Sequence, residues 1–305
     1  MYQIIAKSKY WLIFSAIVIA LAIAAIAAWG LHFGIDFTGG SVLEARYAQD
    51  RPTVDKIQDS LDPLGLDNLI VQPVGDNEIR LRFQEVDEAK HQEILNKLGE
   101  LSPQVDGQPG FEELRYDSIE PSVGRDLRSR ALTAVFLVLV AIIIYVAWAF
   151  RKVSQPVSSW KYGVCGVVAL FHDVLIMVSF MALLGHYYGY QVDITSVAAV
   201  LTILGYSIND TIVVFDRTRE NLLRTRQSFA ETVNISLNQT LTRSIYTSVT
   251  VMLTLVAIVL FGGASIRDFA LILLIGSFFG VYSSIFIASP LLVVWNDWSN
   301  RRKAK

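Results

Sequence analysis

The chain contains six long apolar stretches, and each is close to the roughly 20 residues that an α-helix needs to cross a bilayer core. These stretches lie at residues 10–29, 131–150, 164–184, 194–215, 241–261 and 269–295. The last one is long enough to cross with a tilt or to continue into the interface. The pattern predicts an integral membrane protein with six transmembrane α-helices.

Residues 30–130, between the first two apolar stretches, alternate apolar and polar positions in short segments with the spacing of strands and amphipathic helices, as in a folded α+β domain. Strands are predicted at 42–47, 69–74, 78–83 and 111–119, and helices at 53–61 and 87–101. The order βαββαβ is the split βαβ, ferredoxin-like pattern, and about 80 residues are enough for a small core. No acid pair or histidine cluster in this domain indicates catalysis, and His91 is expected to be a solvated helix residue.

The basic residues predict the orientation in the membrane, because Lys and Arg concentrate on the cytoplasmic side. Those flanking the apolar stretches on one side are Lys7, Lys9, Arg151, Lys152, Lys161, Arg217, Arg219, Arg224, Arg226, Arg243, Arg301, Arg302, Lys303 and Lys305. The short loops on the other side, 185–193 and 262–268, contain only Arg267. Both termini, including a basic tail at 296–305, should therefore be cytoplasmic, and the domain at 30–130 should be periplasmic.

Composition and charge agree with a membrane class. The chain is 53% hydrophobic with a net charge of −2, and its mean hydropathy is +0.44. Residues 30–130 contain 20 of the 28 acids but only 11 of the 26 bases, so the bases follow membrane topology and do not form a nucleic-acid-binding face. The single cysteine, Cys165, allows no intrachain disulfide or cysteine metal site, and no cofactor is predicted.

The first apolar stretch resembles a signal peptide in its basic start, but about 18 apolar residues exceed the usual hydrophobic region of such a peptide. We therefore expect residues 1–29 to be a short cytoplasmic segment and a retained first transmembrane helix. Residues 131–295 then form a bundle of five further helices. Retention also keeps the number of spans even, as two cytoplasmic termini require.

Asp210 is the most informative polar residue, because it lies inside the apolar stretch 194–215. Burying a carboxylate there costs at least about 2.5 kcal/mol. Tyr206, Ser207 and Asn209 lie beside Asp210 or one helical turn before it and are expected to form a polar pocket around it. A proton-carrying site is the leading interpretation, and a structural hydrogen-bond partner between helices is the alternative.

Two further polar residues, His172 and Asp173, fall near the middle of the third apolar stretch. They could extend a proton relay or satisfy a neighbouring backbone group. Asp173 and Asp210 also superficially fit the paired acids of an intramembrane aspartyl protease. The Tyr-Asp and Gly-x-Gly-Asp settings of that class are missing, which disfavours a protease.

The sequence GIDFTGGS at 34–41 follows the first apolar stretch. Gly34, Gly39 and Gly40 permit tight turns, and Asp36 and Thr38 can tie a helix end. A phosphate-binding loop is not indicated, because the segment does not open a helix after a strand. The segment is a hinge or a plain connector between the membrane and the external domain.

Four motifs and their order resemble one known family. They are GIDFTGGS at 34–41, GYSINDTIVVFDRTREN at 205–221, QTLTR at 239–243, and Phe261-Gly262-Gly263. Together with the order of one span, an external domain and five spans, they resemble the SecF branch of the SecD/SecF protein-export family, within the resistance-nodulation-division (RND) transporters. The resemblance covers essentially the whole chain.

The resemblance implies an inner-membrane, non-enzymatic subunit that uses the proton gradient to promote the late stage of protein translocation. The implied partners are SecD, the SecYEG channel with its associated small membrane subunits, exported unfolded polypeptides and membrane lipids. Transporters of this kind are built from two similar halves, and six spans correspond to one half. A partner of matching architecture is thus expected on physical grounds as well.

The resemblance also assigns the essential acid of the fourth span to Asp210 and the essential base of the fifth to Arg243. Asp210 should lie about 8 Å inside the cytoplasmic edge, at about 1.5 Å per residue, within reach of an inward-extending Arg243. A polar stripe on the fifth span accompanies Arg243 and consists of Gln239, Arg243, Thr247, Thr250 and Thr254.

Other interpretations remain open. Arg243 could instead extend only to the membrane interface as an orientation signal. For the whole chain, the alternatives are one half of an RND-type exporter of small molecules or lipids, and a non-conducting scaffold subunit.

Overall fold

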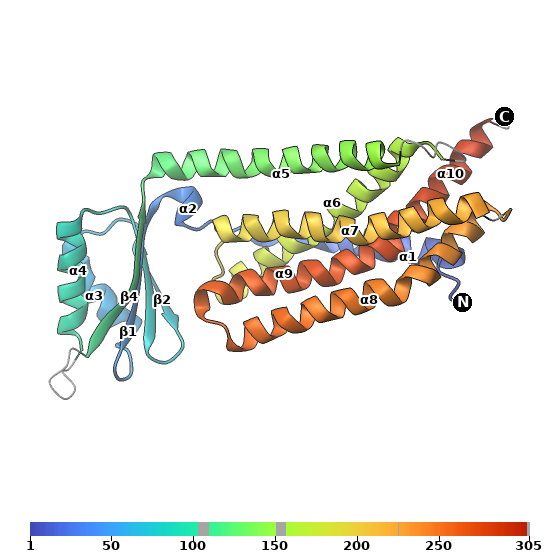
Figure 1. The fold of residues 1–305 in the computed structure, drawn as a ribbon. Helices are drawn as coiled ribbons and strands as arrows, with labels where there is room; N and C mark the ends of the chain where they lie inside the picture. The colour runs from blue at the N-terminus through green and yellow to red at the C-terminus, as the bar shows by residue number, and fades with distance from the viewer. Residues whose placement is uncertain (103–109, 151–156, 225, 304–305) are drawn as a thin grey trace. The chain divides into compact units, whose positions relative to one another are not determined.

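A computed structural model describes residues 1–102, 110–150, 157–224 and 226–303 of the chain (Figure 1). The chain forms two compact units. Unit 1 comprises Met1–His32 and Leu132–Lys305, and unit 2 comprises Phe33–Ala131. Of the basic residues used to predict the orientation, Arg151, Lys152 and Lys305 lie outside the described residues.

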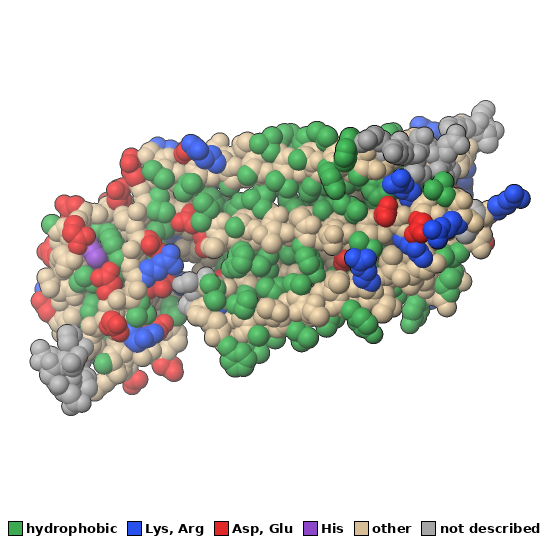
Figure 2. Space-filling model, in the orientation of Figure 1, with side chains coloured by type: hydrophobic (Ala, Val, Ile, Leu, Met, Phe, Trp, Pro, Cys, Tyr) green, Lys and Arg blue, Asp and Glu red, His purple; other side chains and the backbone are tan. Residues whose placement is uncertain are grey.

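The described residues contain six helices that are long and apolar enough to cross a membrane, as predicted. Their elements are η1 (Ile5–Lys7) with α1 (Ser8–Trp29), α5 (Pro121–Ala149), α6 (Ser159–Tyr188), α7 (Ile194–Arg224), α8 (Phe229–Phe261), and α9 (Ala264–Ser283) with η3 (Ser284–Ala288) and α10 (Ser289–Lys303). The last three elements are continuous, because η3 is a π-helical turn between two α-helices. Figure 2 shows hydrophobic side chains over the outward surface of these helices.

Helix α8 begins well before the apolar stretch at 241–261. Ser228 and Glu231 form a capping box at its start. The helix is then unbroken from Phe229 to Phe261. No Gly or Pro occurs between residues 229 and 241 to end the first turns, so the helix continues directly into the apolar segment.

Close packing around α7 and α9 forms the centre of unit 1. α7 packs against α8 and α9, and α1 packs against α6. Gly276 and Gly280 permit this approach: a Cβ atom on Gly276 would lie 2.7 Å from Ile203, and one on Gly280 would lie 3.0 Å from Ser207. Small residues at helix contacts are typical of membrane bundles, where van der Waals packing drives association.

Unit 2 is an antiparallel four-stranded sheet with strand order β2-β3-β1-β4. Its elements are α2 (Ile35–Thr38), β1 (Gly40–Tyr47), α3 (Val54–Leu61), η2 (Asp62–Leu64), β2 (Ile70–Val74), β3 (Glu78–Phe83), α4 (Glu88–Glu100) and β4 (Phe111–Ile119). The predicted βαββαβ order is confirmed, and the strand order is that of the split βαβ pattern. Leu43, Leu81, Ile57 and Leu98 belong to the core between the sheet and the two main helices.

The prediction that His91 is solvated is wrong, because the residue is only 4% exposed. Its ring stacks on Tyr116 with the centroids 3.7 Å apart, and its Nε2 lies 3.4 Å from a carboxylate oxygen of Glu113. Position 91 continues the buried helical stripe of Ile94 and Leu98 one turn toward the N-terminus, and that periodicity determines its burial.

Candidate functional site

Asp210 lies at the contact between α7 and α8. It is 7% exposed, and its Oδ2 accepts a hydrogen bond of 3.4 Å from Ser248 Oγ on α8. The Tyr206 hydroxyl, one turn before Asp210 on α7, donates to the same Ser248 Oγ at 3.1 Å. Tyr206, Ser248 and Asp210 therefore form a short hydrogen-bonded path that crosses from α7 to α8 and back.

Three other residues predicted for the proton pathway, Asn209, Arg243 and Thr247, are exposed in this chain. Thr247 Oγ1 donates to the Arg243 carbonyl oxygen at 2.9 Å. Among the described residues, Arg243 and Asp210 lie on adjacent helices but form no ion pair. Their pairing therefore stays a prediction.

Exposed small and polar residues of α7 and α8 form a surface that we call the polar face. Its members are Thr202, Gly205, Asn209, Gln239, Arg243, Thr247, Thr250 and Thr254. The predicted stripe on the fifth span thus lies on the surface of unit 1. The threonine hydroxyls donate to carbonyl groups three or four residues earlier, as Thr254 does to Thr250 at 3.1 Å. The Arg243 and Asn209 side chains still need polar partners inside a membrane.

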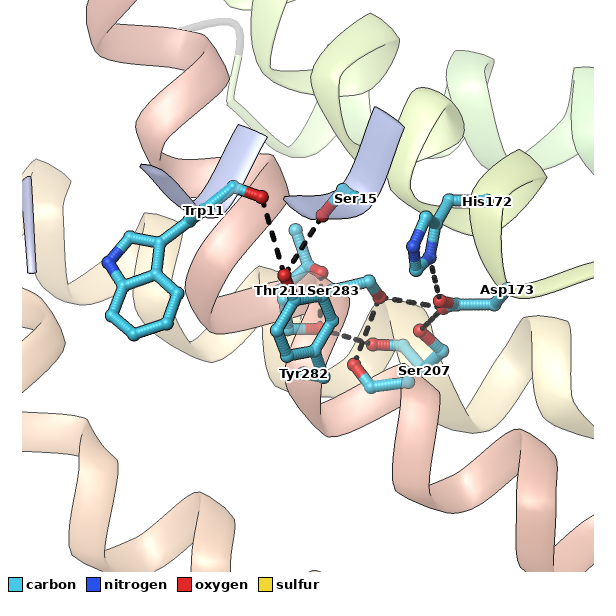
Figure 3. A network of polar contacts seen from close by, with 10 residues as sticks. Trp11, Ser15, His172, Asp173, Ser207, Thr211, Tyr282 and Ser283 are labelled. Atoms are coloured by element: carbon cyan, nitrogen blue, oxygen red, sulfur yellow. Dashed lines mark hydrogen bonds and ion pairs between the residues drawn. The ribbon is translucent and has the colours of Figure 1, made fainter. Parts of the chain in front are cut away.

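Asp173, on α6, occupies a second polar centre that is fully buried (Figure 3). Ser207 Oγ on α7 and Ser283 Oγ on α9 each donate to Asp173 Oδ2 at 2.7 Å. His172 Nδ1 lies 3.1 Å from Asp173 Oδ1. Three helices are therefore joined through one carboxyl group.

Ser207 therefore belongs to the pocket of Asp173, whereas the sequence prediction placed it with Asp210. Successive residues of an α-helix point about 100° apart, so Tyr206 and Asp210 share one side of α7 while Ser207 and Thr211 share the next. Thr211 Oγ1 lies 2.8 Å from Ser284 Oγ, which donates to the Ser207 carbonyl oxygen at 3.2 Å. The two acids thus have separate hydrogen-bond networks on neighbouring sides of one helix.

The second centre continues toward α1. Tyr282 lies next to Ser283, and its ring centroid is 6.0 Å from that of His172. Its hydroxyl lies 3.0 Å from Ser15 Oγ and donates to the Trp11 carbonyl oxygen at 3.4 Å (Figure 3). The π-helical turn η3 begins directly after Ser283, and such turns occur frequently at functional sites.

Sequence reasoning missed the hydroxyl groups that hold the two acids, above all Ser248 and Ser283. Their signal is weak but present: Ser244 and Ser248 lie one helical turn apart in an apolar span, and Ser283 and Ser284 are adjacent in another. Serine is common at helix contacts in membranes without any chemical role. Only the packing of α7 against α8 and α9 selects which serines face the acids.

The glycine motif at 34–41 lies in unit 2, where it comprises α2 and the start of β1. Gly39 and Gly40 have φ values of +74° and +112°, whereas Gly34 has an ordinary φ of −70°. Of the three predicted turn glycines, two thus adopt the left-handed region that favours glycine. The hinge role of the motif stays a prediction.

Side chains tie the short helix α2 on both sides. Asp36 lies in its first turn, and Thr38 Oγ1 donates to the Gly34 carbonyl oxygen at 3.0 Å. Arg82 Nη2 on β3 donates to Thr38 Oγ1 at 2.6 Å, and partial burial lowers the pKa of Arg82. The motif is therefore anchored to the sheet.

Metal chemistry finds no support in the part of the chain that the structure describes. No group of three or more His, Cys, Asp or Glu side chains there is placed to hold a metal ion. Cys165 is buried and unpaired by any disulfide. The two acid centres are instead surrounded by hydroxyl groups, which suit the transfer or stabilisation of protons.

Comparisons with known proteins agree with the resemblance found in the sequence motifs. A family model described as protein export membrane protein SecD/SecF, C-terminal, matches residues 102–298, and one described as the SecD/SecF GG motif matches residues 25–50. Protein translocase subunit SecF of Thermobaculum terrenum is 41% identical over 281 residues, which is 88% of this chain and 86% of that protein. The chain belongs to the SecF family. The resemblance inferred from the motifs is thus confirmed.

Other SecF relatives and a solved structure extend the match. SecF of Anaerolinea thermophila is 38% identical, over 100% of this chain and 99% of that protein. The crystal structure of SecDF, a translocon-associated membrane protein from Thermus thermophilus, matches with a TM-score of 0.82 at 33% identity. That match covers 97% of this chain but 39% of the SecDF chain. SecF relatives are named as translocase subunits, which is a transport role and not a catalytic one.

Proposed function

We propose that this chain is the SecF half of a proton-coupled machine that promotes the late stage of protein translocation across the bacterial inner membrane. The observation that carries the proposal is the buried carboxyl group of Asp210. It is hydrogen-bonded to Ser248 and lies beside the polar face on the outer surface of α7 and α8. A titratable group in that position is costly, and residues of this kind usually have a function.

A SecD half is the proposed partner, and the polar face is its proposed docking surface. Arg243 and Asn209 are exposed on α8 and α7, where lipid offers them no hydrogen bonds. A second helical half would supply those bonds, and coupling sites of such transporters lie between the two halves. The match of this chain to 39% of a SecDF protein supports the same arrangement.

Proton binding at Asp210 is proposed to drive a conformational change that promotes translocation. A proton that crosses 100 mV yields about 2.3 kcal/mol. In the proposed cycle the carboxylate attracts the guanidinium of Arg243, and protonation removes that attraction. Tyr206, Ser248 and Thr247 provide hydroxyl groups near the path, while Asp173 serves the neighbouring network.

The remaining assignments concern topology and substrate. Both termini are proposed to be cytoplasmic, and residues 30–130 to be a periplasmic domain that engages exported unfolded polypeptides beside the SecYEG channel and its small membrane subunits. The SecDF relative is described as translocon-associated, which supports a position beside that channel. On unit 2, acidic and basic side chains are mixed over the visible surface (Figure 2).

Asp210→Asn tests the proposal, because Asn keeps the size and hydrogen bonding of the side chain but does not titrate. We expect the variant to assemble with SecD and SecYEG in vesicles and to lose the gradient-dependent part of precursor translocation. Asp216→Asn is the matched control, since Asp216 is an exposed acid on the same helix. An unchanged gradient-dependent component in Asp210→Asn would overturn the proton role and favour the scaffold interpretation.

A further inference from the structure

An apolar groove of about 580 Å³ opens on the surface of unit 1, between the N-terminal segment and α8, with α9 and η3 as its floor. Its lining is mostly apolar and includes Leu241, Ile245, Val249, Met252 and Phe278, together with the charged Lys7. We call this surface the N-terminal groove.

The N-terminal groove lies on the opposite side of α8 from the polar face. At about 100° per residue, Leu241, Ile245 and Met252 point nearly 180° away from Arg243 and Thr250. A partner half that covers the polar face therefore leaves this groove in contact with lipid. Ile245 and Val249 are 41% exposed each.

The length of the groove matches one membrane leaflet. Its wall on α8 extends from Leu241 to Met252, which corresponds to about 16 Å at about 1.5 Å per residue. Half of a hydrocarbon core that is about 30 Å thick is nearly the same length. An acyl chain of one leaflet therefore fits along the groove.

The lining of the groove includes an unused hydrogen-bond donor and, at its N-terminal end, a positive charge. Lys7 is exposed there, and among the described residues it forms no ion pair. Trp11 packs on Phe286 with the ring centroids 4.5 Å apart. Its buried indole Nε1 has no hydrogen-bond partner within the described chain. A buried donor of this kind requires an acceptor oxygen.

We propose that the N-terminal groove binds an anionic phospholipid of the leaflet on the N-terminal side of the bundle. An acyl chain lies against Ile245, Val249 and Phe278, the phosphate group faces Lys7, and a lipid oxygen accepts from Trp11 Nε1. Because Ser248 lines the same groove and donates to Asp210, the bound chain also excludes water from that side of the acid.

Native mass spectrometry of the purified full-length chain tests the proposal, with phosphatidylglycerol and phosphatidylcholine of identical acyl chains as probes. We expect about fivefold tighter binding of phosphatidylglycerol, the effect of one basic side chain near an anionic headgroup. Lys7→Gln should abolish this preference while leaving binding of phosphatidylcholine unchanged. Trp11→Phe keeps the ring contact but removes the donor, and it should weaken binding of both lipids.

Filling the groove provides the second measurement. Ile245→Trp should prevent binding of both lipids, whereas Leu253→Trp, at a position of α8 that is 64% exposed and outside the groove, should not. Equal affinities of the wild type for the two lipids, or unchanged binding by Ile245→Trp, would overturn the proposal. So would loss of SecD co-purification in Ile245→Trp with lipid binding intact, because the groove would then hold a partner helix.

Discussion

At the residue scale, the two buried acids differ in how firmly they are held. Asp173 accepts short hydrogen bonds from Ser207 and Ser283 and has His172 beside it. Asp210 accepts a longer bond of 3.4 Å from Ser248, and Ser244 is a second hydroxyl donor on the same helix. A carboxyl group with several short hydrogen bonds stabilises the packing of its helices, and one with longer bonds changes partners more easily. The geometry therefore suits Asp173 to holding its helices in position and Asp210 to binding and releasing a proton repeatedly.

This difference predicts unequal effects of two matched substitutions. Asp173→Ala removes the oxygen to which both Ser207 and Ser283 donate. A buried hydroxyl left without its acceptor costs about 1–3 kcal/mol, so the apparent melting temperature of this variant in detergent should fall by several degrees. Asp210→Ala should lower the melting temperature less while removing gradient-dependent translocation. A larger loss of thermal stability in Asp210→Ala than in Asp173→Ala would contradict the assignment.

A pH-dependent prediction concerns Tyr47 in unit 2. Burial raises the pKa of Tyr47 above its ordinary value of 10.0, and its hydroxyl has no hydrogen-bond partner in the described part of the chain. Because the folded state favours the neutral phenol, this contribution to stability is present below pH 10 and is lost as the pH rises toward the raised pKa.

Tyr47→Phe removes both the buried hydroxyl and its ionisation. We expect unit 2 of the variant to be about 1 kcal/mol more stable at pH 8, with a larger advantage over the wild type at pH 10.5. Pulse proteolysis of the full-length chain in urea, followed at cleavage sites within residues 33–131, measures both values. An advantage that stays constant or shrinks between pH 8 and pH 10.5 would show that folding does not raise the pKa of Tyr47.

At the element scale, the turn between α2 and β1 depends on glycine. A Cβ atom on Gly39 would lie 2.5 Å from Pro121 Cα, and its φ of +74° adds backbone strain. Gly39→Ala should therefore destabilise unit 2 by more than the roughly 1–3 kcal/mol that its backbone conformation, with a ψ of +172°, costs a residue other than glycine.

Gly65→Ala is the control for a positive φ without a close contact, because Gly65 has a φ of +62° and a ψ of +43° with open space around it. In that variant we expect only the free-energy cost of the backbone conformation, without a cost from a close contact. The measurement is the urea midpoint of proteolysis within unit 2. Equal midpoints for the two variants would show that the contact with Pro121 relaxes without cost.

At the scale of the whole molecule, the polar face and the lipid-facing surface should respond differently to a bulky residue. Asn209→Trp would block the polar face, and we expect SecD co-purification to fall at least tenfold, equivalent to about 1.4 kcal/mol. Phe171→Trp, at an exposed apolar position of α6, should have no such effect. Normal co-purification of Asn209→Trp would place the SecD contact elsewhere.

The sequence by itself determined the elements of this protein. Stretches of about 20 apolar residues can satisfy their backbone groups in lipid only as helices, so the six spans followed from length and composition alone. Alternation and turn residues gave the βαββαβ order of unit 2, because strand and helix periods are local properties. Asp210 was identified in the same way, by its cost in an apolar segment.

Only the tertiary structure decided which polar side chains surround each of the two buried acids. The placement of Ser207 beside Asp173, the choice of Ser248 as the donor to Asp210, and the exposure of Arg243 all depend on which helices touch and at what rotation. A helical period gives the spacing of residues on one helix but not the partner that each side meets.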